Sequence, residues 1–176
     1  MVKYPILYNK LVIWLYINIK KIILEGDIME IIENILTEHG FSFELIYNDK
    51  PTHTAKEGAD CFNISIEQTA PTLIIYSSIG FYVLVVSGGR GRVDFKEIKH
   101  ILNCKNVRLA TLDEVKTVTG FCVGSIPLFG IPLPYIVDKK LLEFSFIYGG
   151  SRDINYTLKV NPEALLKLNK IIGMLE

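Results

Sequence analysis

The sequence predicts a mixed α/β domain in which helices flank a curled or barrel-like β-sheet. Apolar runs rich in β-branched and aromatic residues occur at 71–89 and again at 135–160. Amphipathic segments with helix-capping signals precede, separate and follow these runs. The chain has 176 residues, of which 49% are hydrophobic and 22% are charged, so we expect one folded domain with one main core.

Residues 1–28 differ in composition from the remainder, and we expect the domain itself to span 29–176. The apolar run at 11–19 has nine residues, whereas a helix that spans a bilayer needs about 20. No small-residue cleavage site follows the run, so a signal peptide is not expected. Residues 25–27 can be encoded by a sequence close to a ribosome-binding site, just ahead of Met29. We therefore hypothesise that translation starts at Met29; the alternative is an interfacial amphipathic anchor.

Two helices and a strand are predicted before the first apolar run. Segment 29–40 places four apolar side chains on one helical face and ends in a glycine, as a helix C-terminus often does. Residues 41–47 alternate apolar and polar side chains, which is typical of a half-buried strand. Thr54, followed three residues later by Glu57, is a capping box that starts a second helix reaching about residue 63.

The middle of the chain predicts a hairpin, two short helices and an ordered loop. The runs 71–78 and 81–89 predict a buried hairpin. Asp94 and Thr111 are the expected N-cap residues of the two short helices. Segment 120–134 has three glycines and three prolines in fifteen residues, too many for a regular element, yet it is apolar. We therefore expect an ordered loop that packs against the core.

The last part of the chain predicts three strands and a helix. The strands are expected at 135–138, 144–150 and 154–160. Asn161-Pro162-Glu163 is a strong helix start, because proline is favoured at the first helical position. We expect this last helix to run to the C-terminus.

The charged and reactive side chains form no familiar catalytic motif. A formal net charge of zero means that RNA contact needs a local patch or recognition of a single-stranded end. Cys61, Cys104 and Cys122 are widely spaced and the chain has three histidines, so neither a disulfide framework nor a zinc cluster is expected. The glycine-rich stretch 87–91 lacks the Lys-Ser/Thr ending of a phosphate loop and is better interpreted as a turn. We expect no metal, no cofactor, no DNA binding and no membrane association of the domain.

Three segments together resemble the YbaK/ProX group of aminoacyl-tRNA deacylases, which includes the editing domain associated with prolyl-tRNA synthetase. THTAKEGADCFNISIEQTAPTLIIY is similar to the family's opening helix and strand, TGFCVGSIPLFG to its substrate loop, and LPYIVDKKLLEFSFIYGGSRDINYTL to its closing strands. These segments span most of residues 47–160. The resemblance implies the YbaK fold and a cytoplasmic hydrolase that removes a small mischarged amino acid from the 3′ end of tRNA. It also implies a class II aminoacyl-tRNA synthetase as a partner.

The resemblance implies a set of site residues as well. Gly124 and Ser125 of the substrate loop are assigned to catalysis, through backbone groups that orient water or the terminal ribose without a covalent nucleophile or a metal. Glycine lets the backbone approach the aminoacyl group, and proline holds the shape of the loop. The expected substrate-binding residues are Ile126, Pro127, Gly149 and Gly150, with Thr69, Asp138 and Ser151 as further polar contacts suggested by their positions.

Four departures from the family pattern leave two functions open. Pro71 stands where the family often has a lysine, and Tyr148 where many relatives have a serine. Leu128 replaces a common proline and Asn155 a common aspartate. Pro71 can neither pair with a phosphate nor donate a hydrogen bond. The chain is therefore either a deacylase or a binding module that keeps the pocket without hydrolysis, with hydrolysis of another small acyl ester as a third reading.

Overall fold

The computed structural model describes residues 28–52 and 54–176, so residues 1–27, which carry most of the expected N-terminal extension, lie outside the described part. The helices are α2 (Ile28–Glu38), α3 (Ala55–Phe62), α4 (Phe95–Ile101), α5 (Leu112–Thr119) and α6 (Glu163–Leu168), with 3-10 turns η1 (Ile66–Gln68), η2 (Gly88–Arg90) and η3 (Lys139–Glu143). The strands are β1 (Phe43–Tyr47), β2 (Thr69–Ala70), β3 (Thr72–Ser77), β4 (Gly80–Val85), β5 (Val107–Leu109), β6 (Tyr135–Asp138), β7 (Ile147–Gly150), β8 (Tyr156–Val160) and β9 (Ile171–Leu175). Within these ranges, no helix combines the length and the apolar character that crossing a membrane requires.

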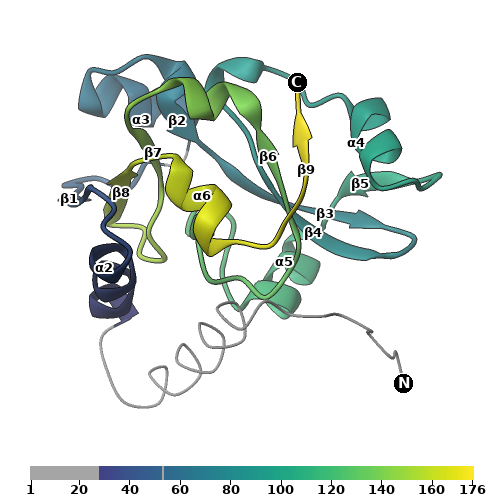
Figure 1. Ribbon diagram of the computed structural model, residues 1–176, viewed down its shortest axis with the longest axis horizontal. Helices are drawn as coiled ribbons and strands as arrows, with labels where there is room; N and C mark the ends of the chain where they lie inside the picture. Colours follow the sequence, from purple (N-terminus) through teal and green to yellow (C-terminus); the bar gives the residue numbers. More distant parts are fainter. Residues whose placement is uncertain (1–27, 53) are drawn as a thin grey trace.

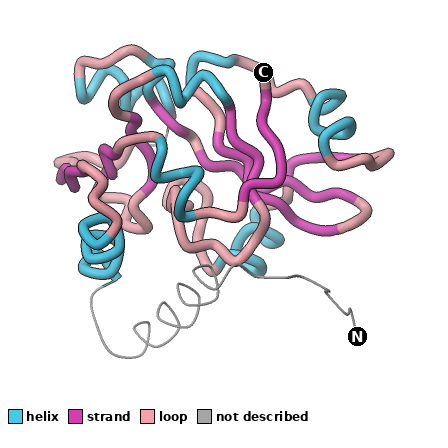
Figure 2. Tube along the Cα trace, in the orientation of Figure 1, coloured by secondary structure: helices cyan, strands magenta, loops and turns pink. Residues whose placement is uncertain are grey.

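The predicted mixed α/β class is confirmed, with the strands divided between two open sheets. The smaller sheet has the order β1-β8-β7-β2 and the larger sheet the order β5-β3-β4-β6-β9. Both are mixed, since β2 runs parallel to β7, and β6 runs parallel to both β4 and β9, while the other pairs are antiparallel. Figure 1 shows the smaller sheet beside α2, and α4 beside β5 in the larger sheet. Figure 2 shows the strands of the larger sheet crossing the middle of the molecule.

The hairpin strands β3 and β4 of the larger sheet pack on both faces because their side chains alternate between two cores. Ile74 and Val83 face the main core, which also takes side chains from the smaller sheet, α2, α6 and the loop before β6. Ile75 and Leu84, one residue further along each strand, face a second cluster that is closed by Ile98 of α4. This explains why the hairpin strands are apolar throughout instead of alternating with polar residues.

The predicted helix boundaries agree with the structure where capping residues define them. Thr54 with Glu57 and Thr111 with Glu114 form complete capping boxes at the starts of α3 and α5. Asp94 caps α4 by accepting a hydrogen bond from the backbone of the helix's first turn. These signals are reliable because both partners lie within three residues of each other.

The prediction that the last helix runs to the C-terminus is wrong. Helix α6 ends at Leu168, and Asn169 has extended backbone angles (φ −115°, ψ 158°). The Asn169 side chain donates a 3.0 Å hydrogen bond to the carbonyl of Leu128. This bond stabilises Asn169 in its extended, non-helical conformation. The chain then forms β9 against β6, where Gly173 lies so close to Ile101 that a Cβ atom would come within 2.3 Å of its side chain. Tertiary contacts therefore override the helical pattern.

Candidate functional site

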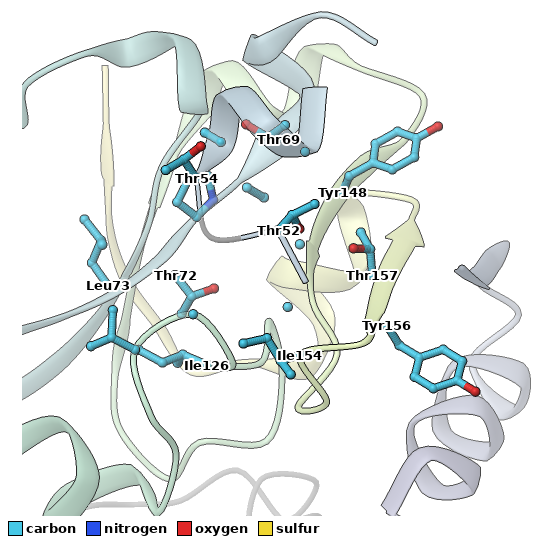
Figure 3. A pocket seen from close by; sticks show the side chains of 18 of the residues that line it. Thr52, Thr54, Thr69, Thr72, Leu73, Ile126, Tyr148, Ile154, Tyr156 and Thr157 are labelled. Carbon is cyan, nitrogen blue, oxygen red and sulfur yellow. The ribbon is translucent and has the colours of Figure 1, made fainter. Parts of the chain in front are cut away.

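A pocket of about 180 Å³ opens where the two sheets meet. Its walls come from α3 and the residues just before it, from the β2–β3 junction, from the loop that precedes β6, and from the β7–β8 hairpin (Figure 3). The described lining residues are Thr52, Thr54, Ala55, Gly58, Phe62, Thr69, Ala70, Pro71, Thr72, Leu73, Val123, Gly124, Ile126, Tyr148, Gly149, Gly150, Asp153, Ile154, Tyr156 and Thr157.

Helix α3 forms one wall and carries an aromatic ring to the pocket. Its buried Gly58 packs toward Thr69, whose Cγ2 atom would be 3.9 Å from an added Cβ, so helix and strand lie close together. At the end of the helix, Phe62 stacks on Tyr148 of β7, with ring centroids 5.4 Å apart and planes 23° apart. Figure 3 shows that the Tyr148 hydroxyl points away from the middle of the pocket. The stacked pair therefore forms part of the rim.

The β2–β3 junction is where the chain passes from the smaller sheet to the larger. Pro71 lies between the two strands, and its carbonyl accepts a 3.2 Å hydrogen bond from Val86 N–H. A proline is tolerated there because the position between strands needs no ladder hydrogen bond from its nitrogen. On either side, Thr69 donates its hydroxyl proton to the carbonyl of Ile66 at 2.7 Å, whereas the buried Thr72 Oγ1 has no hydrogen-bond partner in the described structure.

The loop before β6 lies directly on the glycine pair of β7. Leu128 N–H donates to the carbonyl of Gly150 at 3.0 Å. A Cβ atom at Gly150 would come within 2.1 Å of the Ile126 carbonyl oxygen, and one at Gly149 within 2.7 Å of the Leu128 side chain. Only glycine allows this approach. Gly124 has a φ of +96°, which lets the loop change direction there, and Gly124 itself lines the pocket.

The β7–β8 hairpin contributes Asp153, an exposed residue, to the pocket lining. In the connecting turn, Asp153 Oδ1 accepts hydrogen bonds from the backbone and side-chain nitrogens of Asn155, at 2.8 and 3.1 Å. The buried Ser151 hydroxyl lies 3.1 Å from the Asp153 carbonyl and 2.8 Å from the Tyr156 carbonyl, which fixes the turn. Thr157 accepts a 3.0 Å hydrogen bond from Asn48 Nδ2. These hydrogen bonds stabilise the shape of the turn.

The described lining residues of this pocket offer hydroxyls, backbone groups and one carboxylate. Among the described lining residues there is no histidine, cysteine, lysine or arginine. The described part of the chain also has no group of three or more histidine, cysteine, aspartate or glutamate side chains arranged to hold a metal ion. A nucleophile activated by a neighbouring side-chain base, as in a catalytic triad, is thus not formed by these residues.

A family model for the aminoacyl-tRNA editing domain matches residues 49–168. That range contains every described residue of the pocket lining and all four walls. The chain belongs to the aminoacyl-tRNA editing domain family. The resemblance to the YbaK/ProX group is thereby confirmed at the level of the family.

Solved structures support the fold of this editing domain. A protein described as hypothetical is 29% identical, with a TM-score of 0.73 over 81% of this chain and 96% of its own. A candidate trans-editing enzyme for prolyl tRNA synthetase is 26% identical, with a TM-score of 0.70 over 83% of this chain and 95% of its own. A scaffold protein used for computational grafting of linear epitopes is 23% identical with a TM-score of 0.71, covers 86% of this chain and 96% of its own, and indicates the fold alone.

The editing domain brings together five of the nine residues expected at the site. Thr69, Gly124, Ile126, Gly149 and Gly150 line the pocket. The other four do not belong to the described lining: Ser125, whose hydroxyl donates to the Cys122 carbonyl at 3.0 Å, Pro127, which is buried, Ser151, which holds the hairpin turn, and Asp138.

Asp138 has a structural role instead of the expected contact with substrate. Its fully buried carboxylate accepts from Arg90 Nε at 2.5 Å and Nη2 at 2.7 Å, and from the backbone N–H groups of Ser87 at 3.0 Å and Lys140 at 3.1 Å. Burial alone would raise the pKa of Asp138, but these hydrogen bonds and the charge of Arg90 outweigh it and lower the pKa. With its oxygens occupied in this way, we no longer assign Asp138 to the substrate site.

Of the four departures from the family pattern, two lie in the pocket. Pro71 and Tyr148 are part of the lining, whereas Leu128 is a fully buried core residue and Asn155 holds the Asp153 carboxylate. Sequence reasoning missed the contribution of α3, of Thr72 and Thr157, and of Asp153. The signal that was available for α3 is its capping box, which places the start of the helix but not the surface that it faces.

Proposed function

We propose that this editing domain binds the aminoacylated 3′ end of tRNA and hydrolyses the ester of a small mischarged amino acid. The observation that carries the proposal is the pocket in which the loop at Gly124 and Ile126 lies on the Gly149-Gly150 pair, wholly inside the range matched by the family. The glycines bring backbone groups to the pocket surface without intervening side chains. Backbone donors placed in this way can orient an ester and stabilise the charge that develops on its oxygen.

The size and lining of the pocket favour a small acyl group. The volume of about 180 Å³ is below the roughly 300–1,000 Å³ of pockets for drug-sized ligands. Threonine side chains provide both methyl and hydroxyl groups, so small apolar and small polar side chains are both acceptable. Editing is needed for such amino acids because a synthetase distinguishes one methylene by only about 1–3 kcal/mol.

The aromatic rim provides a place for the nucleotide. Aromatic side chains bind single-stranded nucleic acids by stacking on bases, and Phe62 and Tyr148 form such a platform beside the pocket. We propose that the terminal adenine stacks at this rim while the aminoacyl group enters the pocket. A contact of this kind suits a protein with a formal net charge of zero, because stacking needs no basic surface.

The proposed reaction is the hydrolysis of an ester by water. A water oxygen forms a bond to the ester carbonyl carbon, and the bond from that carbon to the ribose oxygen breaks. The ribose oxygen takes up a proton, so the products are a free amino acid and a tRNA with its terminal hydroxyl restored. Because the described lining offers no side-chain base of the histidine or lysine type, we infer that backbone groups and the neighbouring ribose hydroxyl orient the water.

The deciding experiment is a deacylation assay with tRNAs that carry alanine, serine or cysteine. We expect the purified chain to release at least one of these amino acids faster than the uncatalysed rate and to leave a tRNA charged with a large amino acid unchanged. The control is Gly150→Leu, whose side chain would occupy the space where the loop at Ile126 contacts β7. We expect this variant to be inactive. Equal release with the wild type and the control, for every charged tRNA, would contradict the proposal.

A binding module without hydrolysis is the second candidate, and Pro71 is the observation that favours it. At this half-buried pocket position the family often has a lysine, and a charge-assisted contact with phosphate contributes about 1.5–3 kcal/mol. We therefore predict that Pro71→Lys raises the deacylation rate about tenfold if the remaining pocket is competent. The assay compares initial rates of the two proteins on one charged tRNA at a fixed salt concentration, since phosphate contacts weaken with salt. Fast hydrolysis by the wild type, with no gain from lysine, would exclude the binding module.

The partner follows from the same proposal. The similar structure that is named as a candidate trans-editing enzyme for prolyl tRNA synthetase suggests that this chain acts after a class II synthetase has mischarged its tRNA. We propose a cytoplasmic site of action, where aminoacylation and translation take place.

A further inference from the structure

We propose that Asp153 recognises the α-ammonium group of the aminoacyl ester, so that the pocket selects acyl groups with a free amine. This inference rests on the proposed function and specifies the substrate class of the same site. The consequence is that esters whose amine is absent or blocked, such as hydroxyacyl, formylated or peptidyl ends, bind weakly.

The first argument is the geometry of the hairpin turn. Both hydrogen bonds from Asn155 reach Asp153 Oδ1. No hydrogen bond within the described structure involves the second carboxylate oxygen, and Asp153 lines the pocket. Ser151 and the 3.1 Å bond from Tyr156 N–H to the Asp153 carbonyl hold the turn in place. One oxygen is thus oriented by the protein while the other is available to a ligand.

The second argument is the charge of the pocket. Asp153 is the one formally charged side chain among the described lining residues. The neighbouring Arg152 does not neutralise it, because its guanidinium lies over the ring of Phe121, 5.3 Å from the centroid, and does not belong to the lining. The remaining polar groups are hydroxyls and backbone. Asp153 is exposed, so water screens part of its field, but at contact distance its carboxylate still attracts a cation and repels an acid.

The third argument is the chemistry of the substrate. An aminoacyl ester carries one positive charge near its carbonyl, the α-ammonium; the corresponding group at a peptide N-terminus has a pKa of about 7.7–8.0. A hydrogen bond between ammonium and carboxylate is about twice as strong as one between neutral groups. A lactyl group has nearly the shape of an alanyl group but carries a hydroxyl in place of the ammonium. A comparison of alanyl with lactyl binding therefore measures the effect of the positive charge at nearly constant shape.

The experiment measures binding rather than turnover. The probes are the alanyl and lactyl amides of 3′-amino-3′-deoxyadenosine, which cannot be hydrolysed as esters, titrated calorimetrically into the full chain. We expect the wild type to bind the alanyl probe about tenfold more tightly than the lactyl probe. In Asp153→Asn, which keeps an oxygen for the Asn155 N–H, we expect this ratio to fall to near one with lactyl affinity unchanged. Asp60→Asn, an exposed change of the same charge on α3 outside the described lining, should keep the wild-type ratio.

The outcomes separate this inference from the proposed function. Equal affinity of the wild type for the two probes, or a preference that persists in Asp153→Asn, overturns the role of Asp153 and leaves the editing site intact. Failure of the wild type to bind either probe overturns both. Should Asp153→Asn lose lactyl binding through damage to the turn, Asp153→Ser is the second neutral variant, and a tenfold alanyl preference in it would equally overturn the inference.

Discussion

At the residue scale, the pocket depends on side chains that the protein leaves without partners. Most polar groups around it are committed: Thr69 to a carbonyl, and Thr157 to Asn48. Thr72 Oγ1 is buried without a partner, and one oxygen of Asp153 has no bond within the described structure. A buried polar atom without a partner lowers stability by about 1–3 kcal/mol, so Thr72 Oγ1 needs an explanation, and we propose that a bound ligand supplies its partner.

Replacement of Thr72 by valine tests this interpretation. Valine keeps the shape and removes the unpartnered hydroxyl, so we expect the free energy of unfolding to stay constant or to rise by up to about 1 kcal/mol. Affinity for the alanyl amide probe should fall severalfold, since the ligand loses a hydrogen bond. Urea denaturation and calorimetry measure the two effects. A clear loss of stability in Thr72→Val would mean that the hydroxyl has a structural partner.

The proposed stacking at Tyr148 has a matched pair of variants. Tyr148→Phe keeps the ring and loses a hydroxyl that makes no hydrogen bond within the described structure, so we expect unchanged affinity for the adenosine probe. Tyr148→Leu removes the ring, and stacking contributes about 1–3 kcal/mol per base, so we expect affinity about tenfold weaker. Titration of both variants with the same probe measures this difference. Equal binding by the leucine and phenylalanine variants would place the base elsewhere.

At the element scale, the site exists because a loop and a strand approach closely. The loop before β6 donates a hydrogen bond to β7 and lies over two residues without side chains. A β-strand normally presents side chains on both faces, and these would keep the loop several ångströms away. The two glycines thus act as a pair that brings the loop to the pocket.

Replacement of Gly150 by alanine should push the loop before β6 away from strand β7. The new methyl group would come within 2.1 Å of the Ile126 carbonyl, and backbone cannot move aside without displacing the loop. We expect a loss of about 1–3 kcal/mol in the free energy of unfolding and loss of probe binding. Gly58→Ala is the contrast for stability: its methyl meets Thr69 at an ordinary 3.9 Å inside a helix, where alanine is favoured by about 0.5–1 kcal/mol. Thermal unfolding should show opposite shifts, and equal shifts would contradict the close approach.

At the scale of the whole molecule, one buried ion pair joins segments that are distant in sequence. Asp138 at the end of β6 binds Arg90 in η2, and Arg90 Nη2 also donates to the carbonyl of the C-terminal Glu176 at 2.5 Å. Glu97 of α4 accepts from the Glu176 N–H at 2.8 Å. The pair therefore holds η2 and the chain end after β9 against the C-terminal end of β6, the end opposite the loop before β6.

Asp138→Asn should destabilise the fold in a pH-dependent way. After the change, the half-buried Arg90 keeps Glu97 and the backbone oxygen of Glu176 as partners, so we expect a loss of about 1–3 kcal/mol, less than the roughly 3–5 kcal/mol for a fully unpaired buried charge. The pKa of Asp138 is lowered in the folded state, so its contribution is present above the unfolded value of about 3.9 and is lost as the pH falls through the folded pKa. We expect a larger difference between wild type and variant at pH 7 than in acid below the unfolded value, measured by urea denaturation over a series of pH values. The exposed Asp113→Asn is the control; a pH-independent difference for Asp138 would contradict this role.

The sequence by itself determined the features that depend on neighbouring residues. The capping boxes of α3 and α5 join residues three positions apart, so no tertiary information is needed to find them. The apolar hairpin and the proline- and glycine-rich loop are likewise evident from local composition. The order of these signals also predicted the mixed α/β class, because order is a property of the chain itself. The family was predicted separately, from the resemblance of three segments to a known family.

Tertiary structure alone decided which distant residues meet. Asp138 ends a strand, as a site residue often does, yet its carboxylate binds a guanidinium 48 positions earlier in the chain, since a buried charge requires a partner. The segment after Leu168 becomes β9 because the edge of β6 offers backbone hydrogen bonds that continued helix would not use. The pocket itself brings α3 beside a hairpin that lies far later in the chain, as the 5.4 Å stack of Phe62 on Tyr148 illustrates. Such contacts arise from how the two sheets pack, and that packing is set by the whole core rather than by any local pattern.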